Sequence, residues 1–270
     1  MKPVKRCCLL LLVILLLSGC QAAAEQETIA LRIVDGAGTG TLVLAGQSAG
    51  DVFTVNTEDI TILLDGKEAD ASVLADGMPV EVSYRGGRQE TWPVQLQQVD
   101  AIYGFSRGSK ENPGGTYYDL CGLYLQVLND LWEQDAGLND AIAYVSVDLS
   151  QAPGDLTEGE KAAIAWIFAG QHRAEPLTLT MEELAEQGYL TEIKLDGAAA
   201  PKQYQWEDGL LFTITADNWA ENEVYSLLMV KFHAAKWRTP LGAYGFSGCT
   251  ALWPELGTWS GYQAEAVWIS

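Results

Sequence analysis

Few residues of this sequence have both the type and the spacing that enzyme chemistry needs. The 270-residue chain contains five cysteines and only two histidines, His172 and His233. No His-x-x-x-His and no Cys-x-x-Cys occurs, so the spacing of a zinc site is missing. The glycine-rich stretch 36–40 lacks the lysine of a phosphate-binding loop. We therefore predict no catalytic residue, no metal site and no cofactor.

Three weaker patterns could bind a ligand. Lys231 and His233 lie two residues apart in a predicted strand, so they share one sheet face and could line a pocket. Residues 135–140 offer several oxygen atoms, but fewer than a calcium loop needs, which indicates the turn that ends a helix. Seven aromatic residues could form a platform for a sugar or a peptide, although core packing would use the same side chains. They are Trp237, Tyr244, Phe246, Trp253, Trp259, Tyr262 and Trp268.

Cys20 has the clearest chemical context in the chain. A short basic segment, 1–6, precedes eleven uncharged apolar residues, 7–17, and the sequence Leu17-Ser18-Gly19-Cys20 ends this region. The pattern resembles the lipobox of bacterial lipoproteins. The resemblance implies a diacylglyceryl group on the Cys20 thiol and removal of residues 1–19 as a signal peptide. It also implies an extracytoplasmic protein anchored to the cell membrane by lipid, because two or more acyl chains hold a protein there stably.

Two other outcomes of the N-terminal segment stay open. Residues 22–24 are three alanines, which fit an ordinary secretory cleavage site that would release a soluble protein beginning at Glu25. Residues 7–24 could instead stay uncleaved as a short anchor, although a helix that spans a bilayer needs about 20 apolar residues. We prefer the lipobox because Cys20 directly follows the apolar core.

Two further cysteines remain if Cys20 carries lipid. Cys121 and Cys249 would then be an even pair outside the cytoplasm, where a disulfide between them could form. The alternative is a pair of buried free thiols.

The charge of the chain limits its partners. The formal net charge is −20, and removal of residues 1–19 leaves 13 basic against 36 acidic residues. A surface of this sign repels nucleic acids and anionic lipid head groups. We therefore expect no nucleic-acid partner, and contact with the membrane through the N-terminal lipid alone.

The first half of the mature chain is predicted to be β structure. Residues 20–28 indicate a tether, and residues 29–103 contain short apolar runs separated by turn signals such as Asp65-Gly66. This spacing is typical of a small all-β barrel or sandwich. The stretch 74–82 resembles a turn and strand of the small OB-like barrels in secreted bacterial lipoproteins. The resemblance implies an OB-like fold and no activity.

Residues 104–116, rich in glycine and polar side chains, predict a linker to an α+β domain over 117–270. Apolar residues at spacings of three and four predict a helix over 117–133. Thr157 and Thr180 each precede a glutamate by three residues, which is typical of the capping boxes that begin helices.

Residues 190–270 are predicted to form an antiparallel sheet on which these helices pack. A hairpin of strands 203–206 and 210–215 would begin it. The order of elements resembles NTF2-like and cystatin-like folds. Two stretches, 131–135 and 236–244, resemble uncharacterised lipoproteins of anaerobic Gram-positive bacteria, a group that implies no activity.

Two functions fit these features. We favour a non-catalytic binding or interaction module that is held at the membrane and binds a protein, a peptide or a glycan. The alternative is an extracytoplasmic hydrolase of envelope or environmental polymers. A pocket in which Lys231, His233 and a carboxylate converge would favour the hydrolase.

Overall fold

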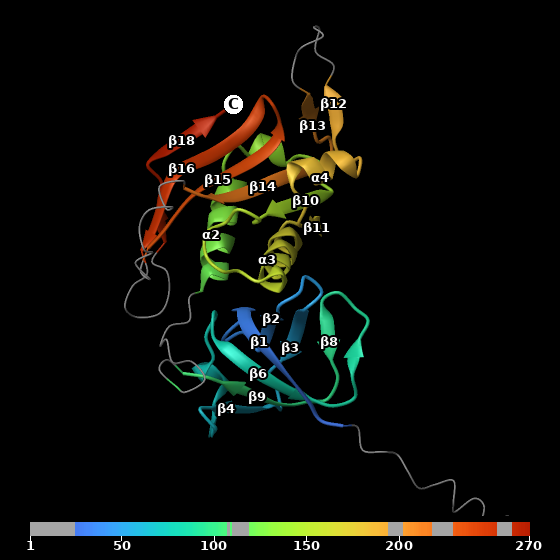
Figure 1. The fold of residues 1–270 in the computed structure, drawn as a ribbon, viewed down its shortest axis with the longest axis vertical. Coiled ribbons are helices and arrows are strands. Elements are labelled where there is room, and N and C mark those ends of the chain that lie inside the picture. The colour runs from blue at the N-terminus through green and yellow to red at the C-terminus, as the bar shows by residue number, and fades with distance from the viewer. Residues whose placement is uncertain (1–24, 107–108, 110–118, 194–201, 218–228, 253–260) are drawn as a thin grey trace, which may run out of the picture.

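The structure, a computed structural model, describes residues 25–106, 109, 119–193, 202–217, 229–252 and 261–270. They form two parts that lie one above the other in Figure 1, an N-terminal sheet and a second part with the helices and a C-terminal sheet. Strands predominate in both parts, so the prediction of a β-rich chain with its α-helices after the N-terminal strands is confirmed.

The N-terminal sheet contains nine strands among the described residues. They are β1 (Glu27–Asp35), β2 (Thr41–Ala45), β3 (Val52–Asn56), β4 (Thr61–Leu64), β5 (Lys67–Ala69), β6 (Pro79–Tyr84), β7 (Arg88–Gln89), β8 (Val94–Leu96) and β9 (Val99–Gly104). Their order across the sheet is β5-β4-β9-β6-β1-β2-β3-β8-β7. The sheet is open at β5 and β7, and the OB-like barrel for residues 29–103 stays a prediction.

Strands β1, β2 and β3 are apolar on both faces because each face covers a different core. Ile33, Leu44 and Phe53 are fully buried inside the N-terminal sheet. Their neighbours Val34 and Val52 belong instead to the hydrophobic cluster of the second part. Since strand side chains alternate, a continuous apolar run indicates a strand between two cores.

The second part contains three α-helices and a mixed sheet. The elements are α2 (Leu120–Glu133), the 3₁₀ helix η2 (Ala136–Asn139), β10 (Tyr144–Asp148), α3 (Glu158–Gln171), β11 (Glu175–Leu177), α4 (Met181–Glu186), β12 (Thr191–Ile193), β13 (Gln203–Gln205), β14 (Gly209–Ala216), β15 (Met229–Thr239), β16 (Gly242–Leu252), β17 (Tyr262–Gln263) and β18 (Ala266–Ile269). The sheet order is β11-β10-β14-β15-β16-β17, and β18 also pairs with β16.

One prediction about this sheet holds in part and another was wrong. The strands of residues 190–270 in this sheet pair antiparallel with one another, but β10, from earlier in the chain, joins them in parallel with β14 and also pairs in parallel with β11. The predicted hairpin of residues 203–215 does not form. Strand β13 pairs with β12 in a separate two-stranded sheet, whereas β14 pairs with β10 and β15. The Asp208-Gly209 turn therefore connects two sheets rather than two paired strands.

Helices α2 and α3 cover one face of the C-terminal sheet. Tyr124 and Leu128 of α2 and Phe168 of α3 are fully buried against Phe212 and Phe232 of the sheet. Asp119 caps α2, since its carboxylate accepts the N–H of Gly122 at 2.8 Å. The apolar period predicted this helix three residues too early, and residues 117 and 118 lie outside the described residues. Helix α4 and the small β12–β13 sheet cover part of the other face.

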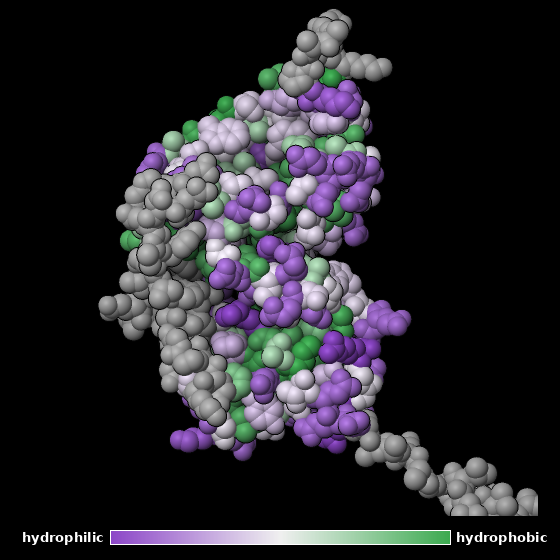
Figure 2. Space-filling model, in the orientation of Figure 1, coloured by the Kyte–Doolittle hydropathy of each residue, from purple (hydrophilic) through white to green (hydrophobic). Residues whose placement is uncertain are grey.

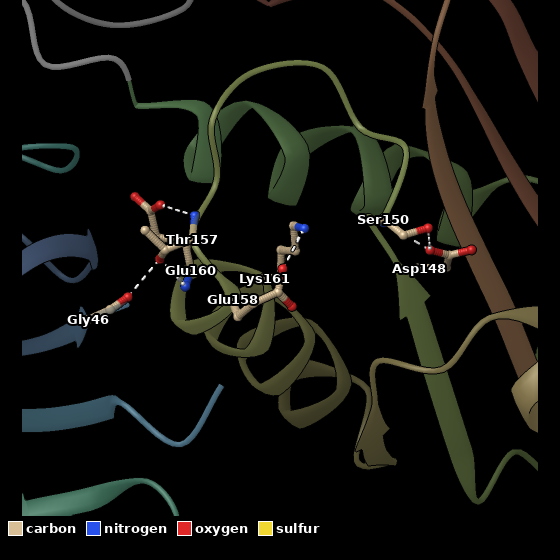
Figure 3. A network of polar contacts seen from close by, with 7 residues as sticks. All are labelled: Gly46, Asp148, Ser150, Thr157, Glu158, Glu160 and Lys161. Atoms are coloured by element: carbon tan, nitrogen blue, oxygen red, sulfur yellow. Dashed lines mark hydrogen bonds and ion pairs between the residues drawn. The ribbon is translucent and has the colours of Figure 1, made fainter. Parts of the chain in front are cut away.

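The two parts meet at the N-terminal end of α3, where the predicted capping box is confirmed. The Thr157 hydroxyl accepts the N–H of Glu160 at 3.1 Å and donates to the carbonyl of Gly46 at 2.7 Å (Figure 3). The buried Glu160 also forms an ion pair with Arg32 at 2.9 Å. The predicted linker 104–116 lies mostly outside the described residues, so the division into two domains stays a prediction.

Hydrophilic side chains cover most of the face shown in Figure 2, with a smaller apolar area over the N-terminal sheet. Within the described ranges, no helix is both long and apolar enough to cross a bilayer.

Candidate functional site

The face of the C-terminal sheet that points away from α2 and α3, here called the outer face, holds the predicted Lys231 and His233. Along β15, buried Phe232, Ala234 and Lys236 point to the helices, and their neighbours point outward. The prediction that Lys231 and His233 share a face is therefore confirmed. Three cross-strand rows follow from the register. They are Leu211–Trp237–Ala243, Thr213–Ala235–Gly245–Trp268 and Thr215–His233.

The imidazole of His233 is held by two groups on the outer face. Its Nδ1 accepts the backbone N–H of Gly248 at 3.1 Å. Its Nε2 lies 3.6 Å from a carboxylate oxygen of Asp217. Because Nδ1 is an acceptor, the neutral ring carries its proton on Nε2 and directs it toward Asp217. The ring is 42% exposed, so it can also contact a ligand.

A second carboxylate lies beside the same glycine. A side chain at Gly248 would collide with the Glu265 carboxylate, which lies directly over this position. The backbone φ of Gly248 is +61°, a conformation that also favours glycine. The Asp217 carboxylate at Nε2 and the Glu265 carboxylate over Gly248 can each accept hydrogen bonds from hydroxyl or ammonium groups.

Lys231 lies on the next outward position of β15. The Asp217 backbone N–H donates to the Lys231 carbonyl at 3.4 Å, so the main chains of these two residues are paired. The structure thus brings Lys231, His233 and Asp217 together. The sequence search missed Asp217 and Glu265, since they belong to no motif. Asp217 reaches His233, and Glu265 reaches Gly248, only in the assembled sheet.

The predicted aromatic platform divides between the two faces. Tyr244, Phe246 and Tyr262 contact one another and the helix-side core. Trp237 and Trp268 lie on the outer face, and the Trp268 ring lies directly over Gly245. The small residues Thr213, Ala235 and Gly245 form the row next to Trp237, and Trp268 closes this row at the sheet edge. Trp253 and Trp259 lie outside the described residues.

On the opposite face, Lys236 is fully buried and binds the end of α2. Its ammonium group donates to the carbonyls of Trp132, Gln134 and Asp135 and to the side-chain oxygen of Asn139. A cation is favourable here because the last carbonyls of a helix have no partner within it. Desolvation lowers the pKa of Lys236 to about 8, against the opposing effect of nearby acids. The oxygens of residues 135–140 therefore surround an ammonium group.

The contact between Lys236 and the end of α2 joins two stretches that lie far apart in the sequence. Residues 131–135 end α2, and residues 236–244 span the turn between β15 and β16. Besides Lys236, Tyr244 donates to the Gln134 side chain at 3.3 Å, and Arg238 donates to the carbonyls of Leu138 and Asp140. Their joint role is to fix the helix end on the sheet.

Cys121 and Cys249 are free, buried thiols in the structure and both belong to the helix-side core. Desolvation raises the pKa of Cys121 well above its usual value and that of Cys249 to about 12. Thiols of this kind are poor nucleophiles because the reactive thiolate is disfavoured.

His172 has a structural role at the end of α3. It is the C-terminal cap residue, stacks on Trp132 at 3.8 Å between ring centres, and lies 3.1 Å from the Asn129 side-chain oxygen. Burial lowers its pKa, so the ring is held by packing rather than by the attraction of a cation to the helix end.

Two stretches, residues 46–50 and 104–108, have the Gly-x-Ser-x-Gly pattern of a nucleophile elbow. Such an elbow needs a strand followed by a helix. The second stretch follows β9, where Ser106 donates its backbone N–H, at 3.0 Å, and its hydroxyl to the Asp65 carboxylate, and residues 107 and 108 lie outside the described residues. The first stretch lies in the turn between β2 and β3, where the backbone N–H of exposed Ser48 donates to the Asp51 carboxylate at 3.0 Å. Ser48 therefore lacks the setting of an activated nucleophile.

The described part of the chain contains no group of three or more His, Cys, Asp or Glu side chains that could hold a metal ion. Asp119 is the carboxyl group with the most altered titration, since desolvation raises its pKa to about 6 and Asp76 and Asp35 add to the shift. These three carboxyl groups lie near the junction of the two parts, far along the chain from His233. Cys20 lies outside the described residues.

Comparison of the chain with protein-family models, with curated proteins and with solved structures finds no match.

Proposed function

We propose that this protein is an extracytoplasmic lipoprotein, anchored to the bacterial cell membrane through Cys20, that binds a ligand without chemical conversion. The apolar segment that ends in Leu17-Ser18-Gly19-Cys20 supports the anchor. Residues 20–28 would serve as the tether. In this arrangement the N-terminal sheet, as an incompletely closed OB-like barrel, stands nearest the membrane. The second part, with an NTF2-like or cystatin-like order of helices and strands, extends outward as a separate domain.

The outer face of the C-terminal sheet is the proposed ligand-binding surface. The observation that carries this proposal is the row of small residues that exposed Trp268 closes at one end. The row lies between His233 and half-buried Trp237, which packs against the apolar cluster that includes Leu184 of α4. Flat apolar rings stack on sugar or peptide surfaces, and the carboxylates of Asp217 and Glu265 accept hydrogen bonds from hydroxyl groups. A neutral glycan fits this combination best, because acidic polymers are repelled by the net charge of −20.

The binding test uses insoluble polymers and two tryptophan variants. Purified chain from residue 21 onward is mixed with cellulose, chitin and peptidoglycan, and the bound fraction is measured by co-sedimentation. Trp268→Ala should weaken binding to the retained polymer about tenfold, as truncation of a central aromatic contact does. Trp92→Ala is the control, because Trp92 is similarly exposed, 47% against 40%, but lies in the N-terminal part. Equal effects of both variants, or retention of none of the polymers, would contradict the proposal.

The anchor has its own test. Labelled palmitate should enter the wild-type protein in a bacterial host and should be missing from Cys20→Ala. Label retained in the variant would exclude lipidation at this residue.

A hydrolase is the second candidate because the Asp217 carboxylate, which could act as a general base, lies 3.6 Å from the His233 ring that would orient it. In that case the polymer would be shortened during the assay, and His233→Ala would abolish the release of soluble fragments.

A further inference from the structure

A pocket opens in the N-terminal sheet where two consecutive strands separate. Strands β8 and β9 are connected by only Gln97 and Gln98, yet they do not pair with each other. Strand β8 pairs in parallel with β3, whereas β9 pairs with β4 and β6. Gln98 has a φ of +48°, which turns the chain sharply at the point of separation. The two strands therefore diverge like the sides of a wedge, and the interior of the curled sheet is accessible between them.

The wedge encloses a volume of about 530 Å³, within the range of small-molecule sites. Its walls combine polar side chains, such as Thr41 and Thr54, with a set of apolar ones. Ile60, Leu96 and Val99 are half-buried, and Val55, only 3% exposed, belongs to the core behind them. An apolar body placed here would cover these side chains and remove them from water, which favours binding.

The rim of the wedge carries oxygen atoms and negative charge. Glu58 and Asp59 are exposed and lie on the loop before β4, and the backbone N–H of Glu58 donates to the Asn56 side chain at 2.7 Å. No lysine, arginine or histidine is among the residues that line the wedge. Two carboxylates at the mouth of a partly apolar pocket attract a cation and repel an anion, and the net charge of −20 adds to this preference.

We propose that the wedge between β8 and β9 binds a small organic cation, an amine attached to an apolar body. The apolar body lies against Leu96 and Val99, and the ammonium group lies at the rim near Glu58 and Asp59. This site is separate from the outer face of the C-terminal sheet and does not depend on the function proposed for that face.

The test compares two fluorescent probes with the same apolar ring system and opposite charge. Dansylcadaverine carries an ammonium group, and dansylglycine carries a carboxylate. Titration of the chain from residue 21 onward, followed by dansyl emission, should give a dissociation constant for dansylcadaverine about tenfold lower than that for dansylglycine. The preference should shrink in 1 M salt, because exposed charges are then screened.

Two variants place the binding in the wedge. Glu58→Gln/Asp59→Asn should reduce the preference to about twofold or less, since both rim charges are lost. Glu81→Gln/Glu90→Gln is the control, because it removes two exposed acids of the same sheet outside the wedge and changes the net charge equally. Gln95→Trp, at an exposed rim position, should fill the wedge and weaken binding of both probes.

Three results would overturn the proposal. One is equal affinity for the two probes. Another is an equal loss of preference in the control and the rim variant. The third is unchanged binding in a Gln95→Trp protein whose circular dichroism matches the wild type.

Discussion

The two faces of strand β15 differ in how deeply their titratable side chains are buried and in how many partners these side chains have. Residues of the two faces nevertheless alternate along the strand. On the helix side, Lys236 is fully buried and its ammonium group contacts four oxygen atoms near the end of α2. On the outer face, His233 is 42% exposed and its ring contacts one backbone N–H and one carboxylate. Both side chains have partners, yet only that of His233 has surface left for a ligand.

This difference separates a polar group that stabilises the fold from one that could bind. A buried ammonium group needs all its hydrogen bonds satisfied within the protein, and Lys236 reaches that state with carbonyl groups alone. Its lowered pKa resembles that of a catalytic lysine, but the side chain itself is fully buried. A perturbed pKa therefore indicates a functional site only where a substrate could reach the group.

The largest expected effect comes from removing the buried cation. Lys236→Met should lower the free energy of unfolding by about 3 kcal/mol at neutral pH, because buried carbonyl groups lose their donor. The matched change on the outer face, Lys231→Met, should cost less than about 1 kcal/mol, as exposed charges do. Urea denaturation followed by tryptophan fluorescence measures both values. Similar losses in the two variants would show that the faces are energetically equivalent.

The pH dependence sharpens the same contrast. The pKa of Lys236 falls to about 8 in the folded protein, against about 10.4 in an unfolded chain. Between these values the unfolded chain binds more protons than the native one, so the contribution of this group to stability rises with pH. The rise is on the order of 3 kcal/mol and is complete above the unfolded pKa.

Urea titrations of wild type and Lys236→Met at several pH values between about 8 and 10.5 measure this contribution as the difference between the two unfolding free energies. That difference should grow as pH increases. A difference that shrinks with pH would mean that the ammonium form is favoured by folding, and the sign of the pKa shift would be reversed.

Sequence reasoning succeeded where the determining contacts are local. The capping boxes at Thr157 and Thr180 depend on residues three apart, and both form as predicted. The amphipathic period likewise identified α2, with an error of three residues at its start. Alternation along β15 was enough to place Lys231 and His233 on one face.

Sequence reasoning failed where contacts between distant segments determine the structure. The partners of Lys236 lie about one hundred residues earlier in the chain, and no spacing rule connects them. Asp217 reaches His233, and Glu265 reaches Gly248, from two other segments. The turn at Asp208-Gly209 looks like a hairpin locally, but β14 pairs with β10 in parallel, which only the assembled sheet determines. For the same reason the separation of β8 from β9 was not foreseen.

The smallest effect concerns the two capping boxes, which lie on opposite sides of the C-terminal sheet. Thr157 begins α3 on the helix side and also donates to the Gly46 carbonyl, whereas Thr180 begins the short α4 over the outer face and is bonded only within its own box. Thr157→Ala should cost about 2 kcal/mol, since the cap and a hydrogen bond between the two parts are both lost. Thr180→Ala should cost about 0.5–1 kcal/mol.

Thr157→Ser keeps the hydroxyl group and should restore most of the lost stability in urea denaturation. If Thr180→Ala proved the more costly change, α4 would be essential to the fold. The outer face would then be built as rigidly as the helix side, and the contrast between a stabilising face and a binding face would no longer hold.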